Sequence, residues 1–492
     1  MGQNRDIAAL LFRAFKQVTL LDFRFQVLIA FLLGLIIPCL SVIAIDFSEA
    51  PFAGGMYESG KYSVPALGLL EEGRYGYFYD DGRYEPELSR LIIYPAFLAF
   101  SFLLAGGENY TVVVLLQTLL AASTVVLVGL SVRMINANWY WPGVLISSST
   151  LGIGYSASIV MPETVSCFLI AGVMYGALSI LKGKNIATGL WILCLAAGFA
   201  YATRPAFLVL PIALSIAIFF TLCFERRFPI KKSSLIAVAP LIVCGVVAIP
   251  QIIWIHSNTG HFSYTLQSGN ALLEWVYPCL RTNFGCGALD NDFRNEAVER
   301  FETELAQLPE NKQSNLAVQN SLAEKVGLSL IAETPYEILL VNGAGSAAKL
   351  MLHTTAMPIL ERLELKQITI SGGIADQGPN YFPMQYIRDL LATPHMWIWA
   401  GAQAMLLVAR CFQLIGIVSG LLDPRLRWVT LTVLVALAGL LAPTLGMGNP
   451  RYRVPMEPFL AFLTVVGFSA VRFKISAAKT GAERKVDEIT ST

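Results

Sequence analysis

Long apolar runs separated by short polar segments dominate the chain. Runs of about 20 residues are long enough to cross a hydrocarbon layer roughly 30 Å thick as helices. A further run, 92–105, is too short to cross comfortably and predicts a helix that dips into the membrane interface. The pattern predicts ten membrane-spanning helices, at 26–45, 110–132, 141–158, 164–181, 187–203, 206–223, 235–255, 396–421, 428–446 and 454–471.

The composition agrees with this pattern. Of the 492 residues, 55% are hydrophobic and only 14% are charged, whereas soluble domains carry roughly 25% charged residues. The net charge of +1 gives no indication of a nucleic-acid partner. The predicted fold class is therefore an all-α polytopic membrane protein, with membrane lipid as its surroundings.

Basic residues in the short loops predict the orientation, because lysine and arginine collect on the cytoplasmic side. They fall in alternate loops, and an even number of spans places both termini on that side. The short basic N-terminus fits a bacterial plasma membrane. The basic positions are Arg5, Arg13, Lys16, Arg24, Arg133, Lys182, Lys184, Arg226, Arg227, Lys231, Lys232, Arg425 and Arg427, followed by a basic tail from Arg472 to Lys485.

This orientation divides the chain into four parts. A first transmembrane module, 1–255, holds seven spans and an outer loop at 46–109. A periplasmic domain, 256–395, is expected to be small and mainly helical, with helical spacing over 290–308. A second transmembrane module of three spans, 396–475, and a cytoplasmic tail, 476–492, complete the chain.

Two of the eight cysteines lie in the predicted periplasmic domain, and the other six lie in spans. An oxidising compartment favours a disulfide between Cys279 and Cys286, with two unpaired thiols as the alternative. No histidine lies close enough in sequence to complete a familiar zinc pattern, so no metal site is predicted.

Charged residues collect at the outer ends of several predicted spans. Glu58 follows the first span, Glu163 opens the fourth, and Arg204 closes the fifth. Arg451 and Arg453 precede the last span. Charges near hydrocarbon are costly and tend to be paired or functional, so this collection suits a site for an anionic headgroup. The alternatives are that the arginines extend to the interface and that Glu163 only favours the helix start.

Four motifs appear in a fixed order on this outer side. They are "ESGKYSVPALGLLEEGRYGY" from Glu58, Arg90 followed by "YPAFLAF" from Tyr94, "MPETVSCFLI" around Glu163, and "RYRVPMEPFLAFL" from Arg451. Together they resemble the GT-C glycosyltransferases, and within that class the protein O-mannosyltransferase and lipid A aminoarabinose transferase group. The resemblance covers nearly the whole chain. It departs at Glu58, where aspartate is commoner, and at Ile92, where many relatives have proline.

The resemblance implies an inverting transfer of a sugar from a polyprenyl-phosphate-linked donor. The acceptor would be a glycan, a lipid or a protein, and the active site would face the periplasm. Some GT-C enzymes bind a divalent cation, which Glu58 and Glu163 could hold here, although the sequence does not require one.

The chemistry assigns roles to these residues. An acceptor hydroxyl is a poor nucleophile near neutral pH and needs a carboxylate base; Glu58 fits best by spacing, with Asp46 or Glu49 as alternatives. Guanidinium groups bind phosphate oxygens in a bidentate fork. The expected catalytic pair is therefore Glu58 and Glu163, and the expected donor phosphate site consists of Arg204, Arg451, Arg453 and Arg90. The expected sugar or acceptor pocket consists of Tyr62, Tyr94, Asp46, Asp80 and Asp81. The last two acids are either solvated or in contact with the acceptor.

Three other functions stay open at this point. An O-antigen-type polymerase or ligase also carries a large outer loop and arginines, but would lack the acid and tyrosine pattern after the first span. A lipid or solute transporter would show internal repeats and polar residues near the bilayer midplane; only Arg410, a candidate buried ion-pair partner, lies there. A scaffold without activity is the third.

Overall fold

The computed structural model describes residues 17–43, 56–79, 81–282, 292–354, 396–444 and 449–490. Within these ranges, the side chains of 43, 56–59, 396 and 475–490 lie outside the described set. The described chain is helical apart from one short hairpin and the connecting turns.

The transmembrane bundle is built from long apolar helices. Eight of them in the described residues are long and apolar enough to cross a membrane, which confirms a polytopic helical membrane protein. The helices that supply them are α2 (Phe23–Ile43), α5 (Tyr110–Ile135), α8 (Glu163–Leu181), η2 and α10 (Pro205–Phe207, Leu210–Phe224), α11 (Ile230–Thr259), α20 (Met396–Leu422), α21 and η4 (Arg427–Leu441, Ala442–Thr444), and η5 and α22 (Pro450–Met456, Glu457–Thr490).

Two of the ten predicted spans differ from expectation. The run 141–158 is divided into α6 (Tyr140–Ser148) and α7 (Leu151–Ala157), preceded by η1 (Ala137–Trp139). At the break, the hydroxyls of Ser149 and Thr150 donate to the Ile146 carbonyl over 2.9 and 3.0 Å, and such local bonds compete with helix continuation. The run 187–203 forms α9 (Ile186–Tyr201), whose 16 residues are short for a span.

The segment between α2 and α5 holds both helix and strand. After α3 (Met56–Glu71), β1 (Gly76–Phe78) and β2 (Tyr84–Pro86) pair as an antiparallel hairpin, and α4 (Ile93–Ala105) follows. A Cβ at Gly76 would lie 2.3 Å from the Glu85 carbonyl oxygen, so the close strand approach requires glycine. The sequence did not predict this hairpin, because its short tyrosine-rich strands lack a long alternating pattern.

A separate helical unit follows α11. It comprises α12 (Ser268–Ala271), the π-helical turn η3 (Leu272–Val276), α13 (Tyr277–Arg281), α14 (Asp292–Ala306), α15 (Glu310–Gln313), α16 (Leu316–Glu333) and α17 (Tyr336–Leu352). The helix expected over 290–308 is α14. Buried side chains of η3, α13, α14 and α16 form its own small core.

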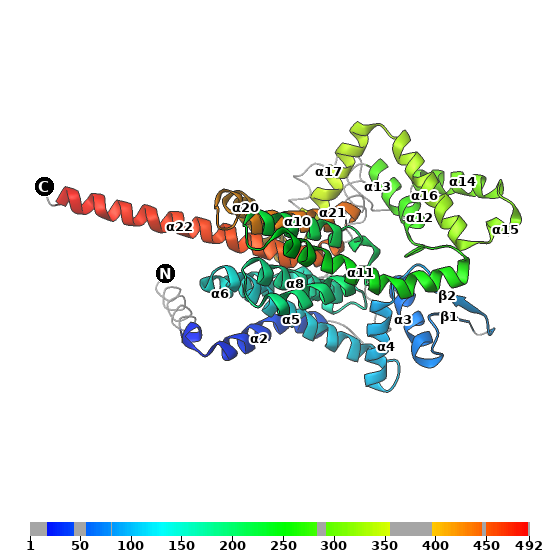
Figure 1. Ribbon diagram of the computed structural model, residues 1–492, viewed down its shortest axis with the longest axis horizontal. Helices are drawn as coiled ribbons and strands as arrows, with labels where there is room; N and C mark the ends of the chain where they lie inside the picture. Colours follow the sequence, from blue (N-terminus) through cyan, green and yellow to red (C-terminus); the bar gives the residue numbers. More distant parts are fainter. Residues whose placement is uncertain are drawn as a thin grey trace.

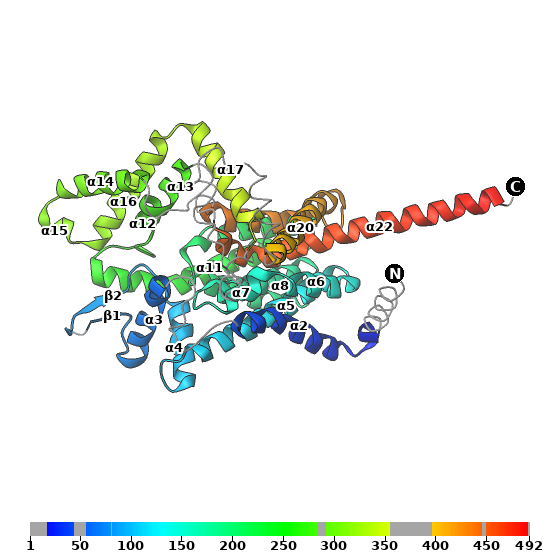
Figure 2. The ribbon, with the colours of Figure 1, turned by 180° about the vertical axis from the view of Figure 1, so that it is seen from behind.

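Figure 1 shows how these parts are arranged. The start of α2 and the end of α22 lie at one end of the elongated bundle, and α12–α17 and the hairpin lie at the other. Figure 2 shows the same separation from behind. The largest apolar core joins α5, α8, α9, α10, α11, α21 and α22.

The helices α20 and α22 cross in backbone contact. A Cβ at Gly416 would lie 2.0 Å from the Leu463 carbonyl oxygen, and one at Gly467 would lie 1.9 Å from that of Phe412. Small residues allow such close approach in membranes, where packing rather than hydrophobic exclusion drives helix association.

Candidate functional site

Glu163 is the centre of a buried charged cluster at the start of α8. It is the first residue of α8, and it is only 1% exposed. Its Oε1 accepts a hydrogen bond from Arg204 Nη1 over 3.1 Å and lies 3.0 Å from Arg451 Nε. Its Oε2 is buried and has no hydrogen-bond partner among the described residues. One carboxylate oxygen is therefore held by two guanidiniums, while the other is available to a ligand.

The two arginines reach Glu163 from different elements. Arg204 has an extended backbone at the turn between α9 and η2. Arg451 lies in η5, where the Asn449 side chain caps the helix by accepting from the Arg451 N–H over 3.0 Å. Both guanidinium carbons lie over the Tyr452 ring, at 4.9 and 5.3 Å from its centroid. This cation–π contact fixes the two groups side by side.

Tyr62 brings α3 to the same cluster. It is 8% exposed, and the Arg90 guanidinium lies 5.1 Å from its ring centroid, with Nη1 at 3.5 Å from the hydroxyl. Burial raises the pKa of Tyr62, Arg90, Arg204 and Arg451 oppose this shift, and Glu163 adds to it. The phenol therefore stays protonated at neutral pH, within the field of all four charges.

Arg90 is positioned by hydrogen bonds that connect its loop to Glu87, Tyr75 and Tyr77. The Glu87 carboxylate accepts from the Ser89 and Arg90 N–H groups over 2.6 and 2.8 Å. The Tyr77 hydroxyl donates to the other Glu87 oxygen over 2.5 Å, and the Tyr75 hydroxyl donates to the Arg90 carbonyl. The hairpin that the sequence did not predict thus fixes a residue of the cluster.

Tyr94 is buried behind Tyr62 and closes the cluster from α4. The two rings contact edge to face with centroids 5.2 Å apart. The Tyr94 hydroxyl donates to Gln117 Oε1 over 2.9 Å, and Gln117 Nε2 donates to the carbonyls of Ala157 and Ile159. Tyr94 therefore connects α4, α5 and the turn before α8.

Four further acids were expected at the site, and the structure describes the side chain of one of them, Asp81. Glu58 lies on α3 four residues before Tyr62, so both positions share one face of the helix, although the Glu58 side chain is outside the described set. Asp46 and Asp80 also lie outside the described residues. Asp81 lies at the hairpin turn, where it pairs with Arg83 at 2.5 Å; both side chains are exposed.

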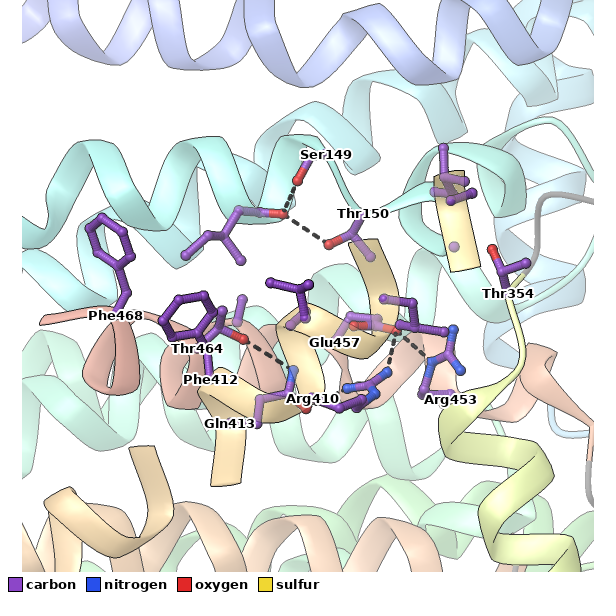
Figure 3. A pocket seen from close by; sticks show the side chains of 18 residues that line it. Ser149, Thr150, Thr354, Arg410, Phe412, Gln413, Arg453, Glu457, Thr464 and Phe468 are labelled. Atoms are coloured by element: carbon purple, nitrogen blue, oxygen red, sulfur yellow. Dashed lines mark hydrogen bonds and ion pairs between the residues drawn. The ribbon is translucent and has the colours of Figure 1, made fainter. Parts of the chain in front are cut away.

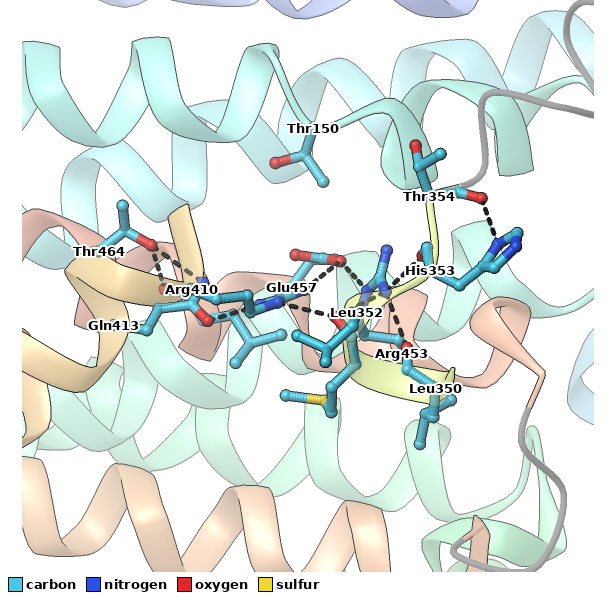
Figure 4. A network of polar contacts seen from close by, with 12 residues as sticks. Thr150, Leu350, Leu352, His353, Thr354, Arg410, Gln413, Arg453, Glu457 and Thr464 are labelled. Atoms are coloured by element: carbon cyan, nitrogen blue, oxygen red, sulfur yellow. Dashed lines mark hydrogen bonds and ion pairs between the residues drawn. The ribbon is translucent and has the colours of Figure 1, made fainter. Parts of the chain in front are cut away.

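Arg453 lies apart from the Glu163 cluster, although it is two residues from Arg451. Its Nε contacts Glu457 Oε1 at 2.7 Å, and its Nη1 donates to the carbonyls of Leu350, Met351 and His353. Figure 4 shows these bonds at the end of α17. The donors of Arg453 thus connect the end of α17 to η5.

Arg410 completes this second network from α20, as a buried ion-pair partner. Its Nη2 lies 3.9 Å from Glu457 Oε1. Its Nε donates to the Met351 carbonyl and its Nη1 to Gln413 Oε1. The single signal for this pairing in the sequence was an arginine in an otherwise apolar span.

Cys279 is buried and disulfide-bonded. Cys286, the expected partner, lies outside the described residues. Six other cysteines are free, including the buried Cys167, Cys194 and Cys244. No group of three His, Cys, Asp or Glu side chains that could hold a metal ion occurs in the part of the chain that the structure describes.

No protein-family model matches the sequence, and no curated protein matches it. One similar solved structure is the archaeal oligosaccharyltransferase AglB from Archaeoglobus fulgidus, in complex with an inhibitory peptide and a dolichol-phosphate. Its TM-score is 0.48 and its sequence identity is 14%, and the match covers 94% of this chain and 52% of that one. An Archaeoglobus fulgidus oligosaccharyltransferase in complex with Zn and sulfate is similar with a TM-score of 0.46 and 12% identity, over 90% and 49% of the two chains. The chain therefore spans about half the length of the solved structures it matches.

Proposed function

We propose that this protein is a membrane glycosyltransferase that transfers a sugar from a polyprenyl-phosphate-linked donor to a glycan, lipid or protein acceptor. The observation that carries the proposal is the state of Glu163. Its Oε1 is held by Arg204 and Arg451, while its buried Oε2 has no hydrogen-bond partner among the described residues. A buried polar atom without a partner is costly, and a sugar hydroxyl would satisfy it.

The arginines supply the donor phosphate site. Arg204 and Arg451 meet at Glu163, and Arg90 lies against Tyr62 within the same cluster. Charge develops on the lipid phosphate as it leaves, and guanidiniums fixed in a site of low dielectric stabilise that charge in the transition state. The cluster is therefore suited to leaving-group stabilisation.

Glu58 is the proposed base, with Asp46 as the alternative. The acceptor hydroxyl oxygen bonds to the anomeric carbon, and its proton passes to the carboxylate. The bond from that carbon to the phosphate oxygen breaks, and its electron pair leaves with the carrier phosphate. Attack opposite the leaving group inverts the anomeric configuration. Tyr62, one helical turn from Glu58, would orient the sugar through its protonated hydroxyl.

We place this site on the periplasmic face of a bacterial plasma membrane. The support is the charge pattern of the short loops together with the end of the bundle that carries the hairpin and α12–α17 (Figure 1). Reporter fusions in the 256–395 segment test the orientation. Activity of a cytoplasm-dependent reporter at that position contradicts it.

The function is tested by a matched pair of variants. A strain lacking the protein is complemented with wild type, Glu163→Gln or Glu72→Gln, and its envelope glycans are analysed by mass spectrometry. Glu72 is an exposed acid just after α3 and serves as the control. We expect wild type and Glu72→Gln to restore a glycan modification that Glu163→Gln does not restore, with equal protein in the membrane. Restoration by all three contradicts the proposal.

The same spectra separate the rival functions. A polymerase defect leaves single repeat units on the carrier, whereas a transfer defect leaves an unmodified acceptor together with loaded carrier. Treating membranes with a chelator before a transfer assay tests the divalent cation; unchanged turnover indicates a metal-independent reaction.

A further inference from the structure

A second polar site is lined by none of the residues of the Glu163 cluster. It is a partly open cavity of about 230 Å³, and it lies among the break between α6 and α7, α20, η5 and α22. Figure 3 shows the polar side chains that face it. We call it the Arg410 cavity; its polar lining includes Ser149, Thr150, Arg410, Gln413, Glu457 and Thr464. It has room for several water molecules at roughly 30 Å³ each.

The charges of the Arg410 cavity are unequal among the described residues. Two guanidiniums, Arg410 and Arg453, share one carboxylate, Glu457, and the three side chains are 9%, 4% and 7% exposed. Buried charges are stable only when they are compensated. The described lining therefore carries an excess positive charge that an anion would neutralise.

Arg410 also has a donor that its neighbours do not use. Its Nη2 is buried and makes no hydrogen bond to the described residues, since the Glu457 oxygen is 3.9 Å away. The residue as a whole is 8% exposed. Guanidinium N–H groups are strong donors and bind phosphate oxygens well. A phosphate oxygen in the cavity would accept the hydrogen bond that this Nη2 group does not otherwise make.

The shape of the lining indicates what carries the anion. Glu457, Ala461, Thr464 and Phe468 line the cavity from α22 at spacings that place them on one helix face. Along α22 the lining thus changes from the charged Glu457, through the small Ala461 and the hydroxyl-bearing Thr464, to the aromatic Phe468. Phe468 is also 41% exposed on the outside of the structure. This order matches an amphiphile, with its headgroup at Arg410 and its apolar chain at Phe468.

We propose that the Arg410 cavity binds the phosphate headgroup of an anionic lipid, at a site separate from the Glu163 cluster. The lipid is either an ambient glycerophospholipid or a polyprenyl phosphate, which share this chemistry. Bound there, it would compensate the two arginines that hold the end of α17, and so stabilise the α12–α17 unit against the bundle.

The test is a lipid-retention measurement on the full chain that needs no transfer assay. The purified protein is equilibrated in nanodiscs of phosphatidylcholine containing either phosphatidylglycerol or a C55 polyprenyl monophosphate, extracted into detergent, and weighed by native mass spectrometry. We expect wild type to retain one anionic lipid. Arg410→Gln should retain about tenfold less, because a charged hydrogen-bond donor is lost.

Two further variants keep the result interpretable. Ala402→Leu fills the partly buried edge of the cavity without removing a charge, and it should also lose the lipid. Arg425→Gln removes an exposed arginine beyond the far end of α20 and should retain it. The proposal is overturned if all variants retain the anionic lipid equally, or if phosphatidylcholine is retained as well as the anionic lipid. If inorganic phosphate displaces the bound lipid and no lipid is preferred over another, the site binds phosphate and the assignment to a lipid is overturned. Which of the two anionic lipids is retained identifies the source.

Discussion

Two charged clusters meet at η5, and they differ in what their arginines contact. At Glu163, Arg204 and Arg451 converge on one carboxylate oxygen and leave the other without a partner among the described residues. At Glu457, Arg453 directs its donors to main-chain carbonyls of the α17 end. The same residue types thus leave a buried carboxylate oxygen without a described partner in one region and bind the main chain at the end of α17 in the other.

The geometry of η5 explains why neighbouring arginines separate. A 3₁₀-helix has three residues per turn, so positions two apart point about 120° away from each other. Arg451 and Arg453 therefore face different sides of the same short helix. Proximity in sequence was a poor guide to a shared site here.

The largest expected effect is at the proposed base. Glu58→Gln should lower transfer by about 10²–10⁴-fold, because a positioned carboxylate that takes the acceptor proton contributes that much. Turnover of purified protein with a polyprenyl-phosphate sugar is the measurement, and unchanged thermal unfolding shows that the variant is folded. Comparison with Asp46→Asn decides between the two candidates: the larger loss identifies the base, and wild-type rates in both exclude this role for either.

Arg453→Met should affect stability and leave the Glu163 cluster unchanged. Removing one partner of a buried ion pair leaves Glu457 poorly compensated, at a cost of about 3 kcal/mol or more. Unfolding followed by circular dichroism in detergent measures this cost. The double variant Arg453→Met with Glu457→Leu should recover part of the loss; no recovery would mean that the carbonyl bonds, not the ion pair, stabilise the region.

Gly467→Ala should separate α20 from α22 and lower stability by about 2 kcal/mol, because the added Cβ would meet backbone rather than a flexible side chain. Gly245→Ala is the control. A Cβ at that position in α11 has nothing within 4 Å, and alanine favours a helix. An equal effect of both changes would show that the helix crossing is not responsible.

The smallest effect belongs to an exposed ion pair. The Arg300 guanidinium and the Ser329 hydroxyl lower the pKa of Glu333 to about 2. An acid whose pKa is lowered in the folded protein stabilises the fold at pH values above its ordinary pKa, which is near 4.5. This contribution is lost as the pH falls from 4.5 toward 2. Because the pair is exposed, the loss should be slight and weaker at high salt. Glu333→Gln should reduce the drop in melting temperature between pH 4.5 and pH 2. A larger drop than in wild type would show that the Arg300–Glu333 pair does not cause this loss of stability.

The sequence anticipated that Glu163 and Arg204 lie together, but not that Arg453 pairs with Glu457 instead. Glu163 opens one span and Arg204 closes the next, so topology alone requires them to lie at the same end of the bundle. The different contacts of Arg451 and Arg453 could not be anticipated, because the sequence does not reveal the 3₁₀-helix that contains them. The hairpin that fixes Arg90 was missed because its strands have three residues each. The break at Ser149 was missed because apolar residues continue on both sides of it.

The backbone contact of Gly416 with α22 and of Gly467 with α20 has a consequence for movement in the membrane. Helices whose backbones touch have no intervening layer of side chains that could rearrange, so widening the space between α20 and α22 would require the backbone itself to move. If a lipid occupies the Arg410 cavity as we propose, the room for its chain would therefore have to come from the side of α6 and α7, where the helix is interrupted at Ser149 and Thr150.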